Sequence, residues 1–133
     1  MPRHSEQQAR DRLKDLSERP DVNAPQAHWA EARQLELDAA LLGKVLQATA
    51  NHHHSIEQIP DVSTEELGAA LSLFEQIRTQ VDRLETQIVI EARRRGMDWK
   101  QIAPHQGLGS SQAASQRYQR LMTRLEEIRQ GVR

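Results

Sequence analysis

The amino-acid sequence predicts an all-α fold, with two long helices forming a dimerising bundle and a module of shorter helices at the C-terminus. Two observations support this class. Apolar residues recur at steps of three and four over long stretches, which is the period of an amphipathic helix. Alternation of apolar and polar residues, typical of a half-buried strand, is missing. Prolines and glycines near positions 20–25, 60, 96 and 107–109 mark the expected helix boundaries.

The composition limits the kinds of protein that this chain can be. Its 133 residues are enough for one domain, or for a small domain with an extension. Only 37% are hydrophobic and 3% aromatic, so the core is thin, and we predict a homodimer through the N-terminal two-thirds. The absence of cysteine suits a reducing cytosol. No apolar run reaches the length of a membrane span, so the expected location is cytoplasmic, without a membrane partner.

Residues 1–22 are predicted to form an N-terminal arm. Ser5 and Gln8 have the spacing of a capping box, and Ala9, Leu13 and Leu16 form a narrow apolar stripe. A helix this short is marginal unless it docks on something. The sequence leaves open whether the arm packs across a partner subunit or is a frayed terminus.

Residues 23–90 are predicted to be a helical packing and dimerisation region. Its first helix should run from about Pro25 to Ala50, with Asn23 as N-cap. One broad apolar face is expected, wide enough for two neighbours: Trp29, Leu35, Leu37, Leu41, Leu42, Val45 and Leu46.

The second long helix should run from Thr64 to Arg95 and stop at Gly96, with a capping box at Ser63 and Glu66. A heptad-like series of apolar residues follows: Leu67, Leu71, Phe74, Ile77, Val81, Leu84, Ile88 and Ala92. Coiled-coil pairing and ordinary packing on the 25–50 helix both fit this pattern.

The run His52–His54 raises the question of a metal site. Neighbours on a helix point about 100° apart, and helical zinc ligands lie four residues apart, so three consecutive histidines cannot converge on one ion. We predict solvated histidines at a helix end or in a loop, and neither a metal site nor a cofactor.

Charge is distributed unevenly along the chain. Residues 1–90 carry a net charge of −6, and residues 91–133 carry +5. A basic C-terminal third on an acidic body would direct one face toward a polyanion.

Residues 91–133 contain the pattern of a helix-turn-helix. Asp98 can cap a short helix, in which Pro104 should cause an early end or a kink. The glycine-containing turn QGLGS follows, and a polar helix begins near Ser110. The inward-facing positions are predicted to be Trp99, Ile102, Ala103, Leu108, Ala114, Tyr118 and Leu121.

The segments DWKQIAP and GLGSSQAASQRYQRL resemble small actinobacterial helix-turn-helix regulators and, more distantly, region four of sigma factors. The resemblance covers about the last third of the chain and implies a DNA-binding transcriptional regulator. Two positions depart from the family pattern. Gln106 stands where an aliphatic residue is usual, which costs core burial, and Ser111 stands where arginine is common, which removes a guanine or phosphate contact.

The predicted partner is double-stranded DNA, read in the major groove by the helix starting near Ser110. The candidate base-reading residues are Ser111, Gln112, Ser115, Gln116 and Gln119. The candidate phosphate-binding residues are Arg93, Arg94, Arg95, Lys100, Ser110, Arg117, Arg120 and Arg124.

No phosphate loop, nucleophile elbow or other catalytic arrangement stands out, so an enzyme is not predicted. Two alternatives to a regulator remain. The chain could be a helical protein-interaction module whose helix-turn-helix no longer reads DNA, or a DNA-binding subunit of a larger assembly. A regulator of this class would be associated with the nucleoid.

Overall fold

A computed structural model describes residues 2–19, 26–54 and 60–131, and within these ranges all regular structure is helical. The predicted all-α class is therefore confirmed. The elements in chain order are α1 (Pro2–Leu13), a 3₁₀ helix (Lys14–Glu18), α2 (Gln26–His54), α3 (Thr64–Arg94), α4 (Trp99–His105) and α5 (Ser111–Arg129). The predicted cap at Asn23 lies outside the described residues.

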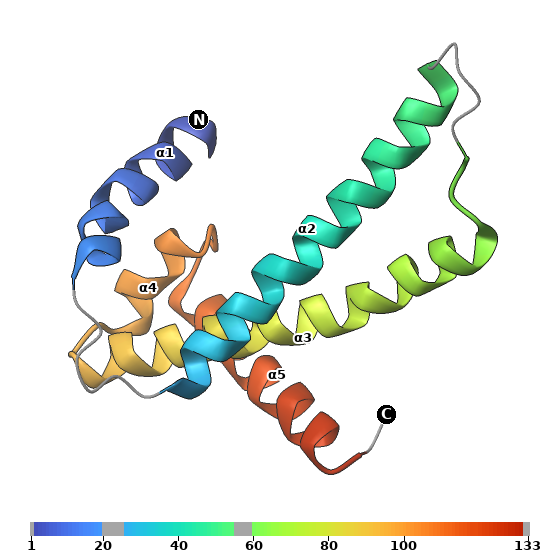
Figure 1. Cartoon of the computed structure of the whole chain (residues 1–133). Helices are drawn as coiled ribbons and strands as arrows, with labels where there is room; N and C mark the ends of the chain where they lie inside the picture. The colour runs from blue at the N-terminus through green and yellow to red at the C-terminus, as the bar shows by residue number, and fades with distance from the viewer. Residues whose placement is uncertain (1, 20–25, 55–59, 132–133) are drawn as a thin grey trace.

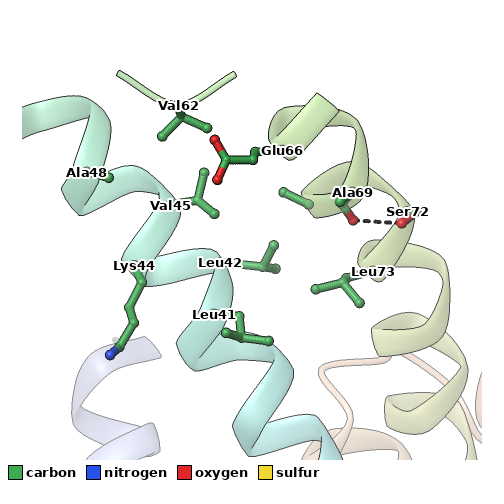
Figure 2. Close-up of a pocket in the computed structure, with 11 residues that line it drawn as sticks. Leu41, Leu42, Lys44, Val45, Ala48, Val62, Glu66, Ala69, Ser72 and Leu73 are labelled. Carbon is green, nitrogen blue, oxygen red and sulfur yellow. Dashed lines mark hydrogen bonds between the residues drawn. The ribbon is translucent and has the colours of Figure 1, made fainter. Parts of the chain in front are cut away.

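The two longest helices, α2 and α3, form a hairpin (Figure 1). The two helices lie together near the start of α2, which we call the closed end, and are apart near the segment that connects them (Figure 1). At the closed end, Arg83 of α3 lies 3.4 Å from Glu31 of α2. Toward the 55–63 connection the helices diverge and leave a groove of about 490 Å³ between them (Figure 2). Aliphatic side chains make up most of its walls, among them Leu41, Leu42, Val45, Ala48, Val62 and Leu73.

The burial of α2 corrects one expectation about its apolar face. Leu35, Leu42 and Val45 are half-buried, but Leu46, which was assigned to the same face, is exposed. Leu42 and Val45 line the groove toward α3, whereas Leu46 is not among the residues that line it. Leu37 and Leu41 are also exposed, and so the broad apolar face is covered only in part.

Polar side chains occupy the buried positions of the α2–α3 hairpin. Asp38, Thr79, Gln80 and Thr86 are all buried. Asp38 accepts a hydrogen bond from Gln34 at 2.9 Å, and the Thr86 hydroxyl donates to the carbonyl of Asp82 at 2.7 Å. The described buried hydrophobic residues lie instead on the C-terminal part of α3 and on α4 and α5.

The N-terminal cap of α3 matches the sequence prediction. The Ser63 hydroxyl accepts from the Glu66 amide at 3.1 Å, and the Glu66 carboxylate accepts from the Ser63 amide at 2.9 Å. The box thus satisfies two amide groups that the first turn of a helix leaves unpaired.

Replacing Ser63 by alanine is expected to destabilise the fold by about 1 kcal/mol, because the Glu66 amide then loses its acceptor. Urea unfolding followed by circular dichroism measures the change. Thr64→Ala, next to the cap on the exposed first turn, is the control and should change stability by less than half as much.

The N-terminal arm is helical but exposed. All side chains from Glu6 to Arg19 are exposed. The arm therefore buries none of these side chains against the other described helices.

Candidate functional site

The C-terminal part of α3, α4 and α5 meet around one small apolar core, and we call residues 89–129 the C-terminal unit. Val89 comes from α3, Ile102 and Ala103 from α4, and Ala114 from α5. Ala114 has no exposed surface, which allows α5 to approach its neighbours closely. Five partly buried residues surround this cluster: Ala92, Met97, Trp99, Leu108 and Tyr118. Every predicted inward-facing position of the unit is buried or half-buried, so that set is confirmed.

Capping residues and a turn glycine determine where the helices of the unit begin and end. Asp98 and Gln101 form a capping box that starts α4, with hydrogen bonds of 2.8 and 2.9 Å. The φ angle of Gly107 is +72°, which favours glycine in the turn after α4. Ser110 caps α5 by accepting from the Ala113 amide at 3.1 Å. α4 is seven residues long and ends at His105, so it ends one residue after Pro104, close to the early end that was expected.

A polar cluster joins α3 to both α4 and α5. The guanidinium of Arg117 donates to both carboxylate oxygens of Glu85, at 2.6 and 2.7 Å. The side-chain amide of Gln106, at the end of α4, donates to Glu85 at 2.8 Å. The hydrogen bonds and positive charge of Arg117 lower the pKa of Glu85 below its ordinary value, against the opposing effect of burial. Gln106 thus has a polar partner on α3.

A second arginine also holds α5 against α3. Arg124 lies 3.1 Å from Glu75 and 3.4 Å from Asp82. Arg117 and Arg124 were predicted to bind phosphate, but the structure places both against carboxylates of α3. Much of their charge is therefore compensated within the chain.

The three arginines at the end of α3 have different surroundings. Arg93 lies over the ring of Trp99 at 4.8 Å and donates to the carbonyl of Met97 at 3.2 Å. Arg94 and Arg95 are exposed and pair with Glu91 one turn earlier, at 2.9 and 3.0 Å. Exposed pairs of this kind stabilise a fold very little, so both arginines can readily pair with another anion instead.

The outward face of α5 carries the remaining candidates. Ser111, Gln112, Gln116 and Gln119 are exposed, and Ser115 is half-buried. Steps of four and three residues put Gln112, Gln116 and Gln119 on one side of the helix. Among the described residues, these five side chains have no hydrogen-bond or ion-pair partner, and the same holds for Lys100 and Arg120. The site therefore combines a polar face with two uncompensated cations.

Sequence reasoning missed the acidic residues that anchor α5. Arg124 pairs with Glu75 and Asp82, and Arg117 pairs with Glu85, all three acids being on α3. These pairs join residues 32 to 49 positions apart in the chain. No local spacing in the sequence indicates them.

The histidine run lies at the C-terminal end of α2. His52, His53 and His54 form the exposed last turn of α2, and His52 lies 3.8 Å from Asp61. The described side chains include no group of three or more metal-ligating residues.

None of the described helices is both long and apolar enough to cross a membrane.

Comparisons with protein-family models, with curated proteins and with solved structures gave no match for this chain. What the C-terminal unit does must therefore be judged from its own residues.

Proposed function

We propose that the chain is a DNA-binding transcriptional regulator that acts as a homodimer, with α4, the turn and α5 as its helix-turn-helix. One observation carries the proposal. The helix α5 is anchored on its inner side by the core and by two arginines that pair with carboxylates of α3, and its outer side presents side chains with no partner among the described residues. A helix held in this way can lie in a major groove and leave its exposed face to read base edges.

The exposed face has the chemistry that base reading requires. Glutamine can donate to and accept from adenine in a bidentate pair, and serine reaches either bases or phosphates. Lys100 and Arg120 flank this face as cations, while Arg94 and Arg95 are available at the cost of weak pairs. Ser110 lies at the α5 N-terminus, where amide groups and the helix dipole favour an anion such as phosphate. A regulator of this kind would act on the nucleoid in the cytoplasm.

A helical protein-interaction module is the second candidate. The pairing of Arg117 and Arg124 with carboxylates of α3 favours it, because it reduces the positive charge that faces a nucleic acid. A DNA-binding subunit of a larger assembly differs from the first proposal only in needing a partner protein.

Selection of bound fragments from a random DNA pool, followed by anisotropy titration at several salt concentrations, tests the proposal. We expect an enriched sequence bound at least ~10³-fold more tightly than unrelated DNA. The logarithm of the binding constant should fall linearly with that of the salt concentration. Failure to bind any duplex at micromolar protein and low salt would contradict the proposal and favour the interaction module.

A further inference from the structure

The helix α3 has a stripe of large apolar side chains that the described residues cover only in part. Leu67, Phe74, Val81 and Ile88 are seven residues apart and are 42%, 39%, 44% and 70% exposed. A step of seven returns to nearly the same side of a helix. Between them, Ala70, Ile77 and Leu84 complete a heptad pattern and are half-buried. We call the four exposed residues the α3 seam.

The seam lies between the two sides of α3 that already have neighbours. Ala70 and Leu73 face α2 across the groove. Glu75, Asp82 and Glu85 face α5. At about 100° per residue, Phe74 and Val81 fall between these two sides. The apolar stripe of α3 is thus wider than the surface that α2 alone can cover. Such a width is typical of a heptad helix that packs against one more partner.

The surface area of the whole chain indicates how large that partner contact is. The accessible surface is 10959 Å², whereas a compact folded chain of 15.2 kDa exposes only about 7,100 Å² by the scaling of surface with mass. The exposed arm accounts for part of the excess. The whole excess, about 3,900 Å², is larger than the ~1,000–2,500 Å² that one subunit loses in an obligate homodimer, so the chain has surface enough for such a contact.

We propose that a second copy of this chain covers the seam, with the two α3 helices antiparallel about a two-fold axis between positions 77 and 78. This register brings Leu67 against Ile88 of the partner subunit and Phe74 against Val81 of the partner subunit. Because a two-fold contact is reciprocal, all four seam residues of both copies are covered at once. Registers centred on Phe74 or on Val81 leave one seam residue of each copy uncovered.

The same register has a consequence for the DNA-binding face, and this step rests on the proposed function. The helices α5 and α2 lie to opposite sides of the seam, so a two-fold axis across the seam puts both α5 helices on one side of the dimer. The two copies of Val89, which anchors the C-terminal unit, are then about 23 residues apart along the helix axes, or roughly 34 Å. Half-sites one turn of DNA apart are spaced by ~34–36 Å. Registers centred on Phe74 or Val81 give roughly 45 or 24 Å instead.

Sedimentation equilibrium of the full chain without DNA tests whether a second copy of the chain covers the seam. We expect a dimer at tens of micromolar, and an at least ~30-fold higher dissociation constant for Phe74→Gln/Val81→Gln. The control, Leu37→Gln/Leu41→Gln, introduces glutamine at two exposed apolar positions of α2 and should stay dimeric. A monomeric wild type, or a double seam variant that dimerises like the wild type, would overturn the proposal. Circular dichroism verifies that each variant is folded, and Ile88→Gln replaces the double variant if it is not.

Cysteine cross-linking tests the register, because the chain has no cysteine of its own. Under mild oxidation Phe74→Cys/Val81→Cys should form a covalent dimer, whereas neither single variant should. The two positions lie about 10 Å apart along one helix, too far for a bridge within a chain. Cross-linking by both single variants would indicate parallel helices, and cross-linking by one alone would indicate a register centred there. Either result overturns the register. A dimer that cross-links as expected but binds no DNA would refute the proposed function and leave the seam contact standing.

Discussion

Replacing Gln112 and Gln116 by alanine is expected to flatten the DNA sequence preference of the protein. Each bidentate contact between glutamine and adenine contributes ~1–3 kcal/mol of discrimination, so the double variant should lose at least ~30-fold of the specificity ratio. Both side chains are exposed on α5, so their loss should leave the fold unchanged. Anisotropy titration against the selected site and a scrambled site measures the ratio.

The salt dependence separates this loss from a general weakening. Because glutamine neutralises no phosphate, the slope of log affinity against log salt should be unchanged in the double variant. Gln87→Ala, on the exposed surface of α3, is the control and should bind like the wild type. If the double variant keeps both affinity and selectivity, α5 is not the reading helix.

Arg117→Ala is expected to act on the stability of the C-terminal unit and not on phosphate contacts. Removing the guanidinium leaves the largely buried Glu85 without its bidentate partner. Arg117 is itself 40% exposed, so we discount for solvent screening and expect a loss of about 1–2 kcal/mol. Urea unfolding should show that loss, while the salt slope of DNA binding stays the same.

Arg120→Ala provides the matched comparison on the same helix. Arg120 is exposed and has no ion-pair partner among the described residues. Its loss should leave stability unchanged and reduce the salt slope by about one unit for a lost phosphate contact. If the two variants behave the other way round, the division of the arginines into anchoring and DNA-facing ones is wrong.

The contact between Glu85 and Arg117 also predicts how stability depends on pH. The folded-state pKa of Glu85 lies below its ordinary value of 4.5 because of the hydrogen bonds from Arg117. The unfolded state therefore binds the proton more readily, and the contribution of Glu85 is complete above pH 4.5. It is lost as the pH falls through the lowered pKa. Urea titrations at pH 7 and in acid should show a smaller acid-induced loss for Glu85→Gln than for the wild type.

Local signals in the sequence predicted most of the helix boundaries. Ser63 with Glu66 and Asp98 with Gln101 each form the box that their spacing indicates, and Ser110 caps α5. These features depend on contacts three residues apart, which the chain order alone determines. The inward-facing residues of the C-terminal unit were predictable for the same reason, because a helical period defines one side.

Contacts between distant segments were not predictable in the same way. Leu46 is exposed although the neighbouring Val45 lines the groove toward α3, and no local pattern encodes how two helices cross. Arg117 and Arg120 look alike in the sequence, but only Arg117 points to a carboxylate on α3. Which arginines are free to bind a ligand therefore depends on how the helices pack, and the local sequence does not determine that packing.

The anchoring of α5 by carboxylates of α3 bears on how such a protein would search a chromosome. Arg117 and Arg124 are paired with carboxylates of α3, so we expect the attraction to random duplex to be weaker than a net charge of +5 in residues 91–133 suggests. Weak non-specific attachment means short residence on unrelated DNA and little one-dimensional diffusion along it. The protein would then reach its target mostly by repeated dissociation and rebinding through solution, and its occupancy would depend strongly on its copy number.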